Sequence, residues 1–183
     1  MKKRYIFPLF LLAIPLVYFM GPKVEYPTID AKIQTLSLPL AELDKYIAQK
    51  EQNVSNIKAD NEARIVWADS IRKTPYSMVY LHGFSASAME GNPIHKELAK
   101  RYGCNLYLAR LAQHGIADRE TFKDLTPKAL VDSAKEAIAI GKLLGDKVIV
   151  LSCSTGGTLS AYLAAENPDW IAAQMLFLSL IHI

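Results

Sequence analysis

The sequence has few of the residues that build disulfide or metal frameworks. Its 183 residues include only two cysteines, Cys104 and Cys153. It contains no Cys-x-x-Cys, no His-Glu-x-x-His and no Gly-x-x-x-x-Gly-Lys-Ser/Thr, so zinc and P-loop sites lack their minimum parts. It also has no internal repeat and no low-complexity tract. We therefore expect no metal and no cofactor, and we expect both thiols to be small buried hydrophobes.

The chain carries little excess charge. Lysine and arginine number 21 against 18 acidic residues, and the net charge of +3 comes entirely from Lys2, Lys3 and Arg4. The rest of the chain is neutral and lacks the basic face that nucleic-acid binding requires. Apolar residues make up 51% and charged residues 21%, which excludes disorder, collagen and coiled coil as the main state. The length suggests one domain.

Residues 1–22 contain no acidic residue and resemble a membrane segment. The basic cluster precedes an uncharged run whose 16 to 18 helical residues would span roughly 24–27 Å, slightly short of the ~30 Å hydrocarbon core. The run ends in Tyr18-Phe19-Met20, which is too bulky for a signal cleavage site. We expect a single uncleaved transmembrane helix over residues 5–20. The basic end would stay in the cytoplasm and the body would lie on the extracytoplasmic side, in the periplasm of a Gram-negative cell. The alternative is secretion after cleavage.

A stalk and one helix are expected next, together covering residues 23–59. Residues 21–39 contain three prolines and no clear apolar period, which indicates the stalk. Apolar residues then recur at helical spacing from Leu40 to Ile47, which predicts an amphipathic helix over residues 40–52.

The body, residues 60–178, alternates between short apolar runs and helical segments. Pro127 fits the first helical position after a Thr126 N-cap, and Gly145 suits the helix end. From residue 77 onward the alternation predicts right-handed βαβ units, and hence an α/β fold with a parallel sheet. Strands are predicted at 63–67, 77–81, 105–109, 147–151 and 172–178, and helices at 93–102 and 127–144.

A serine-rich turn follows the strand predicted at 147–151. Ser152-Cys153-Ser154-Thr155-Gly156-Gly157 leads into a helical stretch at 158–166. This matches the nucleophile elbow Gly-x-Ser-x-Gly, with Ser152 in the first glycine position. Backbone must pass close on both sides of the elbow, so Ser152 and Gly156 are suitably small. We predict that Ser154 is a nucleophile. A phosphate loop, which would want a Gly-x-Gly-x-x-Gly pattern and a lysine, and a plain polar turn that caps the helix are the alternatives.

A second motif supports the nucleophile. Tyr80-Leu81-His82-Gly83-Phe84-Ser85 ends the strand predicted at 77–81. The His82-Gly83 pair lets the loop fold back over the sheet edge, so that the next amide can face the elbow. The N–H groups of Phe84 and Thr155 would then form an oxyanion hole.

Together these motifs resemble the α/β-hydrolase superfamily, in particular its monoglyceride-lipase-like and proline-iminopeptidase-like esterases. The resemblance covers roughly residues 60–178. It includes Arg110-Leu111-Ala112-Gln113-His114-Gly115, which is similar to a family loop ending in Gly-His-Gly. Ser152 and Gln113 depart from the family glycines. The resemblance implies a mostly parallel sheet with flanking helices, and a triad in the order Ser, Asp or Glu, His.

The resemblance also implies that the triad is incomplete in this chain. His82 precedes the nucleophile and is expected to brace its own loop, as is His114, whereas His95 is expected to be a solvated helix residue. The family places its acid and histidine after two further strands, so we expect an inactive fragment without them. Residues 178–183 match a translation of CTG TCT CTT ATA CAC ATC, the end sequence of transposase-based sequencing libraries. That match predicts a non-native tail, including His182.

Three functions compete at this point. The first is a membrane-anchored serine hydrolase that cleaves carboxylic esters, either acyl lipids or small esters. The second is a catalytically silent hydrolase-like module that binds at the membrane. The third is an aminopeptidase or amidase of the same fold. Intact Ser154 and the His82-Gly83 loop favour the first.

Overall fold

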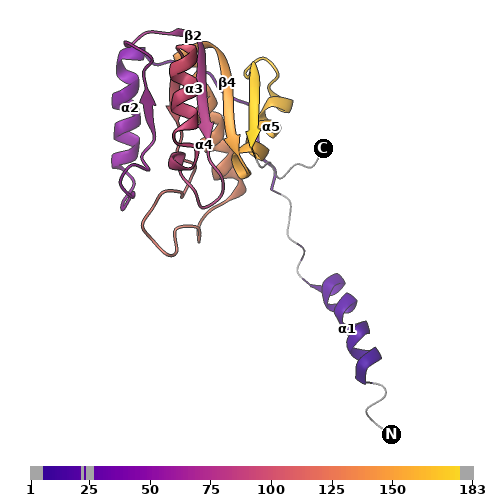
Figure 1. Cartoon of the computed structure of the whole chain (residues 1–183). Helices are drawn as coiled ribbons and strands as arrows, with labels where there is room; N and C mark the ends of the chain where they lie inside the picture. Colours follow the sequence, from indigo (N-terminus) through magenta and orange to yellow (C-terminus); the bar gives the residue numbers. More distant parts are fainter. Residues whose placement is uncertain (1–5, 22, 24–26, 178–183) are drawn as a thin grey trace.

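The computed structural model describes residues 6–21, 23 and 27–177 (Figure 1). The first helix, α1, runs from Ile6 to Met20. None of the helices in these described ranges is both long enough and apolar enough to cross a membrane. The tail predicted at 178–183 lies outside the described residues.

Five strands form one sheet in the order β1-β3-β2-β4-β5. Strands β2 to β5 are mutually parallel, as predicted, and only β1 pairs antiparallel, with β3. Two strands are longer than their apolar runs, because Thr74 at the start of β2 still pairs with Gly145 at the start of β4. The strands are β1 Arg64–Val66, β2 Thr74–Leu81, β3 Asn105–Leu108, β4 Gly145–Cys153 and β5 Ala173–Phe177.

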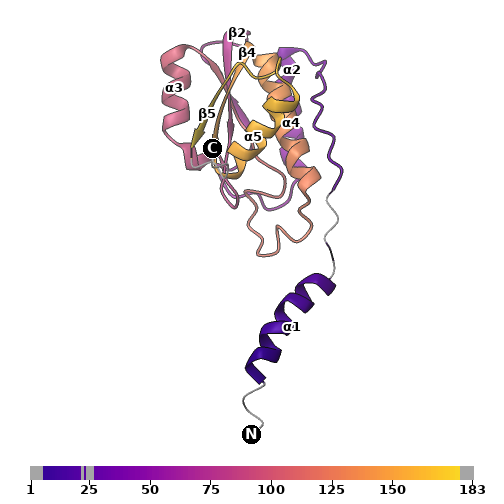
Figure 2. The ribbon, with the colours of Figure 1, turned by 90° about the vertical axis from the view of Figure 1, so that its right-hand side faces the viewer.

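Helices cover both faces of the sheet (Figure 2). One face packs against α3, Ile94–Tyr102, and the other against α2, α4 and α5. Side chains alternate along β2, so that Val79 enters one core and Tyr80 the other. The three helices on the second face are α2 Leu40–Gln52, α4 Pro127–Leu144 and α5 Thr155–Glu166.

The predicted boundaries of α4 are confirmed. The Thr126 hydroxyl accepts the Ala129 N–H at 3.1 Å, and Pro127 occupies the first turn. Gly145 ends the helix, but it starts β4 at once in an extended conformation instead of making a left-handed cap. A Cβ at Gly145 would lie 2.3 Å from the Ser77 nitrogen, so the glycine lets β2 approach closely.

The segment before α2 packs on the body. Ala31 and Ile33 are buried in the same core as α4 and α5. The Asn167 side chain, at the end of α5, accepts the Ile33 N–H at 3.1 Å and donates to the Ala31 carbonyl at 2.9 Å. The amphipathic α2 then buries Leu43 against the same core. Residues 31–47 therefore contribute to the hydrophobic core.

The prediction that His95 is a solvated helix residue is wrong. His95 is buried, its Nε2 lies 2.7 Å from the Ala88 carbonyl, and its ring packs edge-on against Tyr80 at 4.8 Å. Its neighbour Ile94 is exposed instead. The inner face of α3 is set by His95 and Ala99, one turn apart, because the histidine satisfies a carbonyl that an isoleucine could not. Burial lowers the pKa of His95.

Candidate active site

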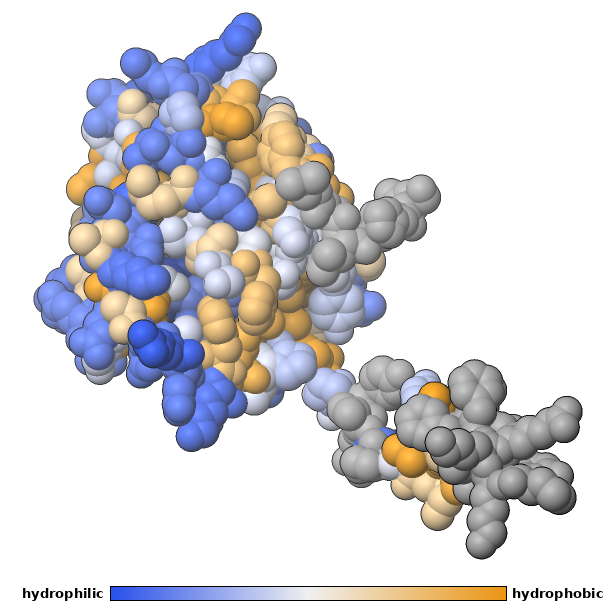
Figure 3. Space-filling view, turned by 60° about the horizontal axis from the view of Figure 1, so that its bottom comes forward, coloured by the Kyte–Doolittle hydropathy of each residue, from blue (hydrophilic) through white to orange (hydrophobic). Residues whose placement is uncertain are grey.

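The carboxyl ends of the parallel strands meet at one edge of the sheet, at the lower end in Figure 1. His82 follows β2, the loop from Ala109 follows β3, and Ser154 follows β4. Figure 3 turns this edge toward the viewer and shows apolar patches among polar surface. Phe84 is one of the exposed apolar side chains of the loop after β2. The topology therefore brings the two predicted motifs to the same edge.

Ser154 occupies a strained turn between β4 and α5. Its backbone has φ 47° and ψ −113°, a region that residues other than glycine rarely adopt. The turn is fixed on both sides: the Ser154 N–H donates to the Phe177 carbonyl at 2.9 Å, and its carbonyl accepts the Thr158 N–H at 3.1 Å. Strain of this kind is found where a side chain must be held in one direction, as the elbow motif requires.

The residues flanking Ser154 in the elbow have no free space. A Cβ added to Gly156 would lie 2.2 Å from the Leu81 carbonyl oxygen, so the end of β2 passes directly over the first turn of α5. Ser152 is fully buried. In the sheet it lies between its register partners, Leu81 of β2 and Leu176 of β5. Its hydroxyl has no hydrogen-bond partner among the described residues. Small residues are therefore required at both positions by the neighbouring backbone.

His82 is fully buried and braces the loop that follows β2. Its Nε2 accepts the Leu111 N–H at 3.1 Å, so the ring proton is on Nδ1, which donates to the Gly83 carbonyl at 2.8 Å. Burial lowers the pKa of His82 to about 4, so the ring is neutral near pH 7. A trans peptide places its N–H opposite its C=O, so this bond also sets the direction of the Phe84 N–H.

Neither predicted oxyanion donor has a hydrogen-bond acceptor among the described residues. Thr155 is the first residue of α5, where the N–H has no acceptor within the helix. No acceptor for the Phe84 N–H occurs in the part of the chain that the structure describes. Gly83 brings the two motifs together, since a Cβ on it would lie 3.4 Å from the Ser154 Cβ.

His114 belongs to the aromatic packing behind the loop. Its Nδ1 lies 2.7 Å from the Ala112 carbonyl, and its ring centroid lies 5.0 Å from that of His82 and 5.4 Å from that of Phe84. Burial lowers the pKa of His114. None of the three histidines within the described ranges is hydrogen-bonded to Ser154, and His182 lies outside those ranges.

The backbone of Gln113 has a conformation that is unusual for a residue with a side chain. Gln113 adopts φ 61°, a left-handed conformation that favours glycine, the residue expected here from the resemblance described above.

Cys153 is only partly buried, which differs from the expectation, whereas Cys104 is buried as expected. Burial raises the pKa of Cys153, and the neighbouring Glu90 carboxylate raises it further. We therefore expect a mainly protonated thiol beside Ser154.

Two acidic residues at this edge escaped the analysis of the sequence. Glu90 accepts the Gly83 N–H at 2.8 Å, and Glu51 of α2 forms a two-point ion pair with Arg110, the shorter contact being 2.7 Å. No local pattern marks either carboxylate, because an acid on a loop or helix end is usually solvated. Groups of three or more side chains able to ligate a metal are not found in the described part of the chain.

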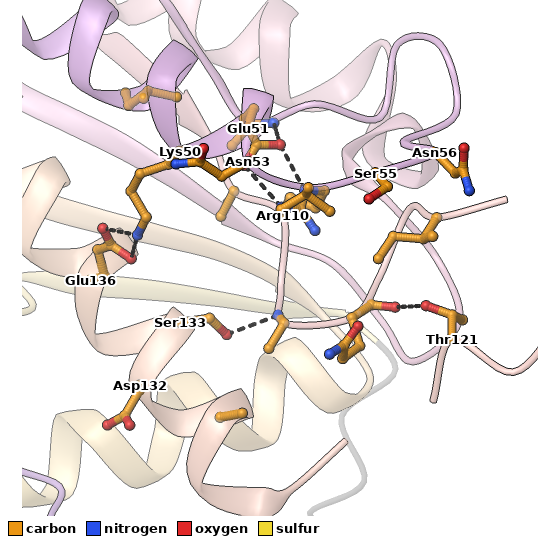
Figure 4. A pocket seen from close by; sticks show the side chains of 18 of the residues that line it. Lys50, Glu51, Asn53, Ser55, Asn56, Arg110, Thr121, Asp132, Ser133 and Glu136 are labelled. Carbon is orange, nitrogen blue, oxygen red and sulfur yellow. Dashed lines mark hydrogen bonds and ion pairs between the residues drawn. The ribbon is translucent and has the colours of Figure 1, made fainter. Parts of the chain in front are cut away.

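A cavity of about 840 Å³ lies beside α2 and α4 (Figure 4), and Ser154 is not among the residues that line it. It is bounded by α2, by the loop after β3 and by α4. Four of the charged side chains that line it form two ion pairs, Glu51 with Arg110 and Lys50 with Glu136. The hydroxyl of Tyr46 also donates to Glu136, and burial together with that carboxylate raises the Tyr46 pKa to about 12. The ion pairs join α2 to α4 and to the loop after β3.

Comparison with known proteins finds partial similarity to lipolytic enzymes. No family model matches the chain. Over 99 residues it is 32% identical to a thermostable monoacylglycerol lipase of Bacillus sp. (strain H-257), an alignment that covers 52% of this chain and 37% of the lipase. The solved structure described under "LipS and LipT, two metagenome-derived lipolytic enzymes" superposes with a TM-score of 0.59 at 18% identity. That superposition covers 68% of this chain and 48% of the other.

The chain thus spans less than half the length of either protein. Within that span, the mostly parallel sheet and the flanking helices are shared features of fold. The described part of the chain therefore has a partial α/β-hydrolase-like fold, with esterases and lipases among the proteins it resembles.

Proposed function

We propose that the protein is a serine hydrolase that cleaves carboxylic esters through an acyl-enzyme on Ser154. The observation that carries the proposal is the strained backbone of Ser154, at a turn against which Gly83 packs. The N–H groups of Phe84 and Thr155, which follow Gly83 and Ser154, have no acceptor among the described residues. A serine held in this way, with two donors beside it, is the arrangement that acyl transfer needs.

The chemistry follows in two steps. The Ser154 hydroxyl oxygen attacks the ester carbonyl carbon while its proton passes to a general base, and the carbonyl oxygen becomes an oxyanion that accepts the Phe84 and Thr155 N–H groups. The alcohol leaves with a proton, and water then hydrolyses the acyl-enzyme. His82 is excluded as the base because its Nδ1 proton and its Nε2 lone pair are both committed to backbone groups.

The substrate class is proposed from the relatives. One is a monoacylglycerol lipase and another belongs to a study of lipolytic enzymes, so acyl lipids or small esters are the substrates to test first. No observation within the described residues favours an amide or peptide substrate over an ester.

The test compares serine variants of the product of the complete gene. Ser154→Ala should abolish hydrolysis of a short p-nitrophenyl ester and labelling by a fluorophosphonate probe, because the nucleophilic oxygen is gone. Ser152→Ala should leave both largely intact, and Ser70→Ala, in the loop before β2, is a remote control. Loss of activity in Ser152→Ala but not in Ser154→Ala would show that the nucleophile is assigned to the wrong serine.

A further inference from the structure

Glu90 reaches back from a short 3-10 helix, Ala88–Gly91, to the loop that carries the proposed oxyanion donor. Its Oε2 accepts the Gly83 N–H at 2.8 Å and the Tyr80 hydroxyl at 3.2 Å. The bond to Gly83 joins residues seven apart in the sequence, so it closes the loop on itself. A hydrogen bond to a charged acceptor is stronger than one between neutral groups.

Gly83 lies between this carboxylate and the nucleophile. A Cβ added to Gly83 would meet Glu90 Oε1 at 3.0 Å and the Ser154 Cβ at 3.4 Å. Glu90 accepts the Gly83 N–H and so fixes the peptide plane between His82 and Gly83. His82 donates to the Gly83 carbonyl and so fixes the peptide plane between Gly83 and Phe84. The two planes together define both backbone dihedrals of Gly83, which has more conformational freedom than any other residue type.

Neighbouring hydrogen bonds and packing fix the position of Glu90. The Ser87 carbonyl accepts the Glu90 N–H at 3.0 Å, and His95 is bonded to the Ala88 carbonyl at 2.7 Å. Gly91 allows the helix to pack on the sheet, since a Cβ there would lie 2.5 Å from the Tyr80 ring. The carboxylate is therefore placed by the buried Tyr80 and His95 and is not an arbitrary surface conformation.

The charge of Glu90 cannot be what the reaction uses. A negative charge near the elbow opposes an oxyanion through Coulomb repulsion. The useful property is the acceptor oxygen, which fixes the Gly83 N–H. This distinction separates a glutamine variant, which keeps an acceptor oxygen, from an alanine variant, which does not.

We propose that Glu90 is a positioning residue that orients the Phe84 N–H for the oxyanion by holding Gly83 against the elbow. This inference rests on the proposed serine hydrolase function. Without Glu90, Gly83 regains rotational freedom and the donor spends less time in the productive direction.

The experiment combines kinetics and NMR on the product of the complete gene. Glu90→Ala should lower kcat about tenfold with little change in KM, because the lost interaction matters mainly in the transition state. Glu90→Gln should restore most of the activity. Glu97→Ala is the matched control, since the Glu97 side chain is exposed and has no hydrogen bond or ion pair within the described ranges. In glycine-labelled protein, the Gly83 amide should exchange faster in Glu90→Ala than in wild type.

Two kinetic results would overturn the inference: an unchanged kcat in Glu90→Ala, or a loss in Glu90→Gln as large as in Glu90→Ala. If the wild type hydrolyses no ester, the proposed function fails, and the Gly83 amide still decides the role of Glu90. An unchanged Gly83 exchange rate in Glu90→Ala would then refute it. Should Glu90→Ala not fold, the same amide is followed in Glu90→Gln, where retained protection supports the inference and lost protection overturns it.

Discussion

Single residues at this edge of the sheet are constrained more by the atoms packed around them than by their own side chains. Gly156 is in contact with the end of β2, Gly83 lies between Glu90 and Ser154, and Ser154 itself has a rarely populated backbone conformation. Small changes at these positions should therefore have large effects, whereas equally conservative changes at open positions should not.

Replacing Gly156 by alanine should lower the free energy of unfolding by about 3 kcal/mol, because the new Cβ would lie 2.2 Å from the Leu81 carbonyl oxygen and backbone must move. Gly103→Ala is the matched control. Gly103 has φ 61° with no atom within 4 Å of an added Cβ, so only the left-handed conformation is penalised, by about 1 kcal/mol. Urea denaturation of both variants measures the difference, and equal losses would contradict the close approach.

Stability should fall in mild acid because of His82. Its pKa is lowered from 6.5 to about 4 in the folded chain, so the unfolded chain binds more protons between those values. The free energy of unfolding therefore decreases as the pH falls through this window, by about 3 kcal/mol from His82 alone. His95 and His114 shift in the same direction. The urea midpoint should therefore decrease from pH 7 to pH 4, and a flat profile would disprove the assignment.

At the scale of elements, α2 is joined to the edge loop by one ion pair. Arg110 and Glu51 are only 8% and 13% exposed, and Glu51 also accepts the Ala63 N–H at 3.0 Å. Arg110 in turn donates to the His114 carbonyl at 3.2 Å. The helix before the sheet thus supports the loop whose His114 ring packs against Phe84.

Glu51→Ala should lower the free energy of unfolding by about 3 kcal/mol, because it leaves the buried Arg110 guanidinium unpaired. Glu120→Ala removes a comparable carboxylate whose partner Lys123 is on the surface, and should change the free energy by less than about 0.5 kcal/mol. Chemical denaturation distinguishes the two, and similar values for both variants would show that the Glu51 pair is no stronger than a surface contact.

At the scale of the whole molecule, attachment to a membrane through residues 5–20 stays a prediction. Helix α1 has 15 residues and a length of about 22 Å, against about 30 Å of hydrocarbon. We expect the complete protein to remain with membranes after carbonate extraction, and a variant lacking residues 2–22 to be released. Release of the intact protein by carbonate, or a product beginning near residue 21, would refute a single uncleaved anchor.

Local patterns in the sequence were sufficient for most elements. The Thr126 cap, the following proline and the apolar stripe located α4 to the residue, since capping and periodicity are properties of neighbouring residues. The strand runs located β2 to β5 within a few residues. The same reasoning failed at His95, because which side of a short helix faces the sheet depends on its partners, here Ala88 and Tyr80.

The sequence by itself determined the parallel α/β order, the strand–turn–helix around Ser154 and the loop after His82. Each of these features depends on residues that are adjacent along the chain. Only the tertiary structure decided that Glu90 holds Gly83, that Glu51 pairs with Arg110, and that residues 31–47 join the core. These contacts link segments brought together by the packing of separate elements. A carboxylate gives no local signal of the partner it meets, so such pairs follow from the fold and not from spacing.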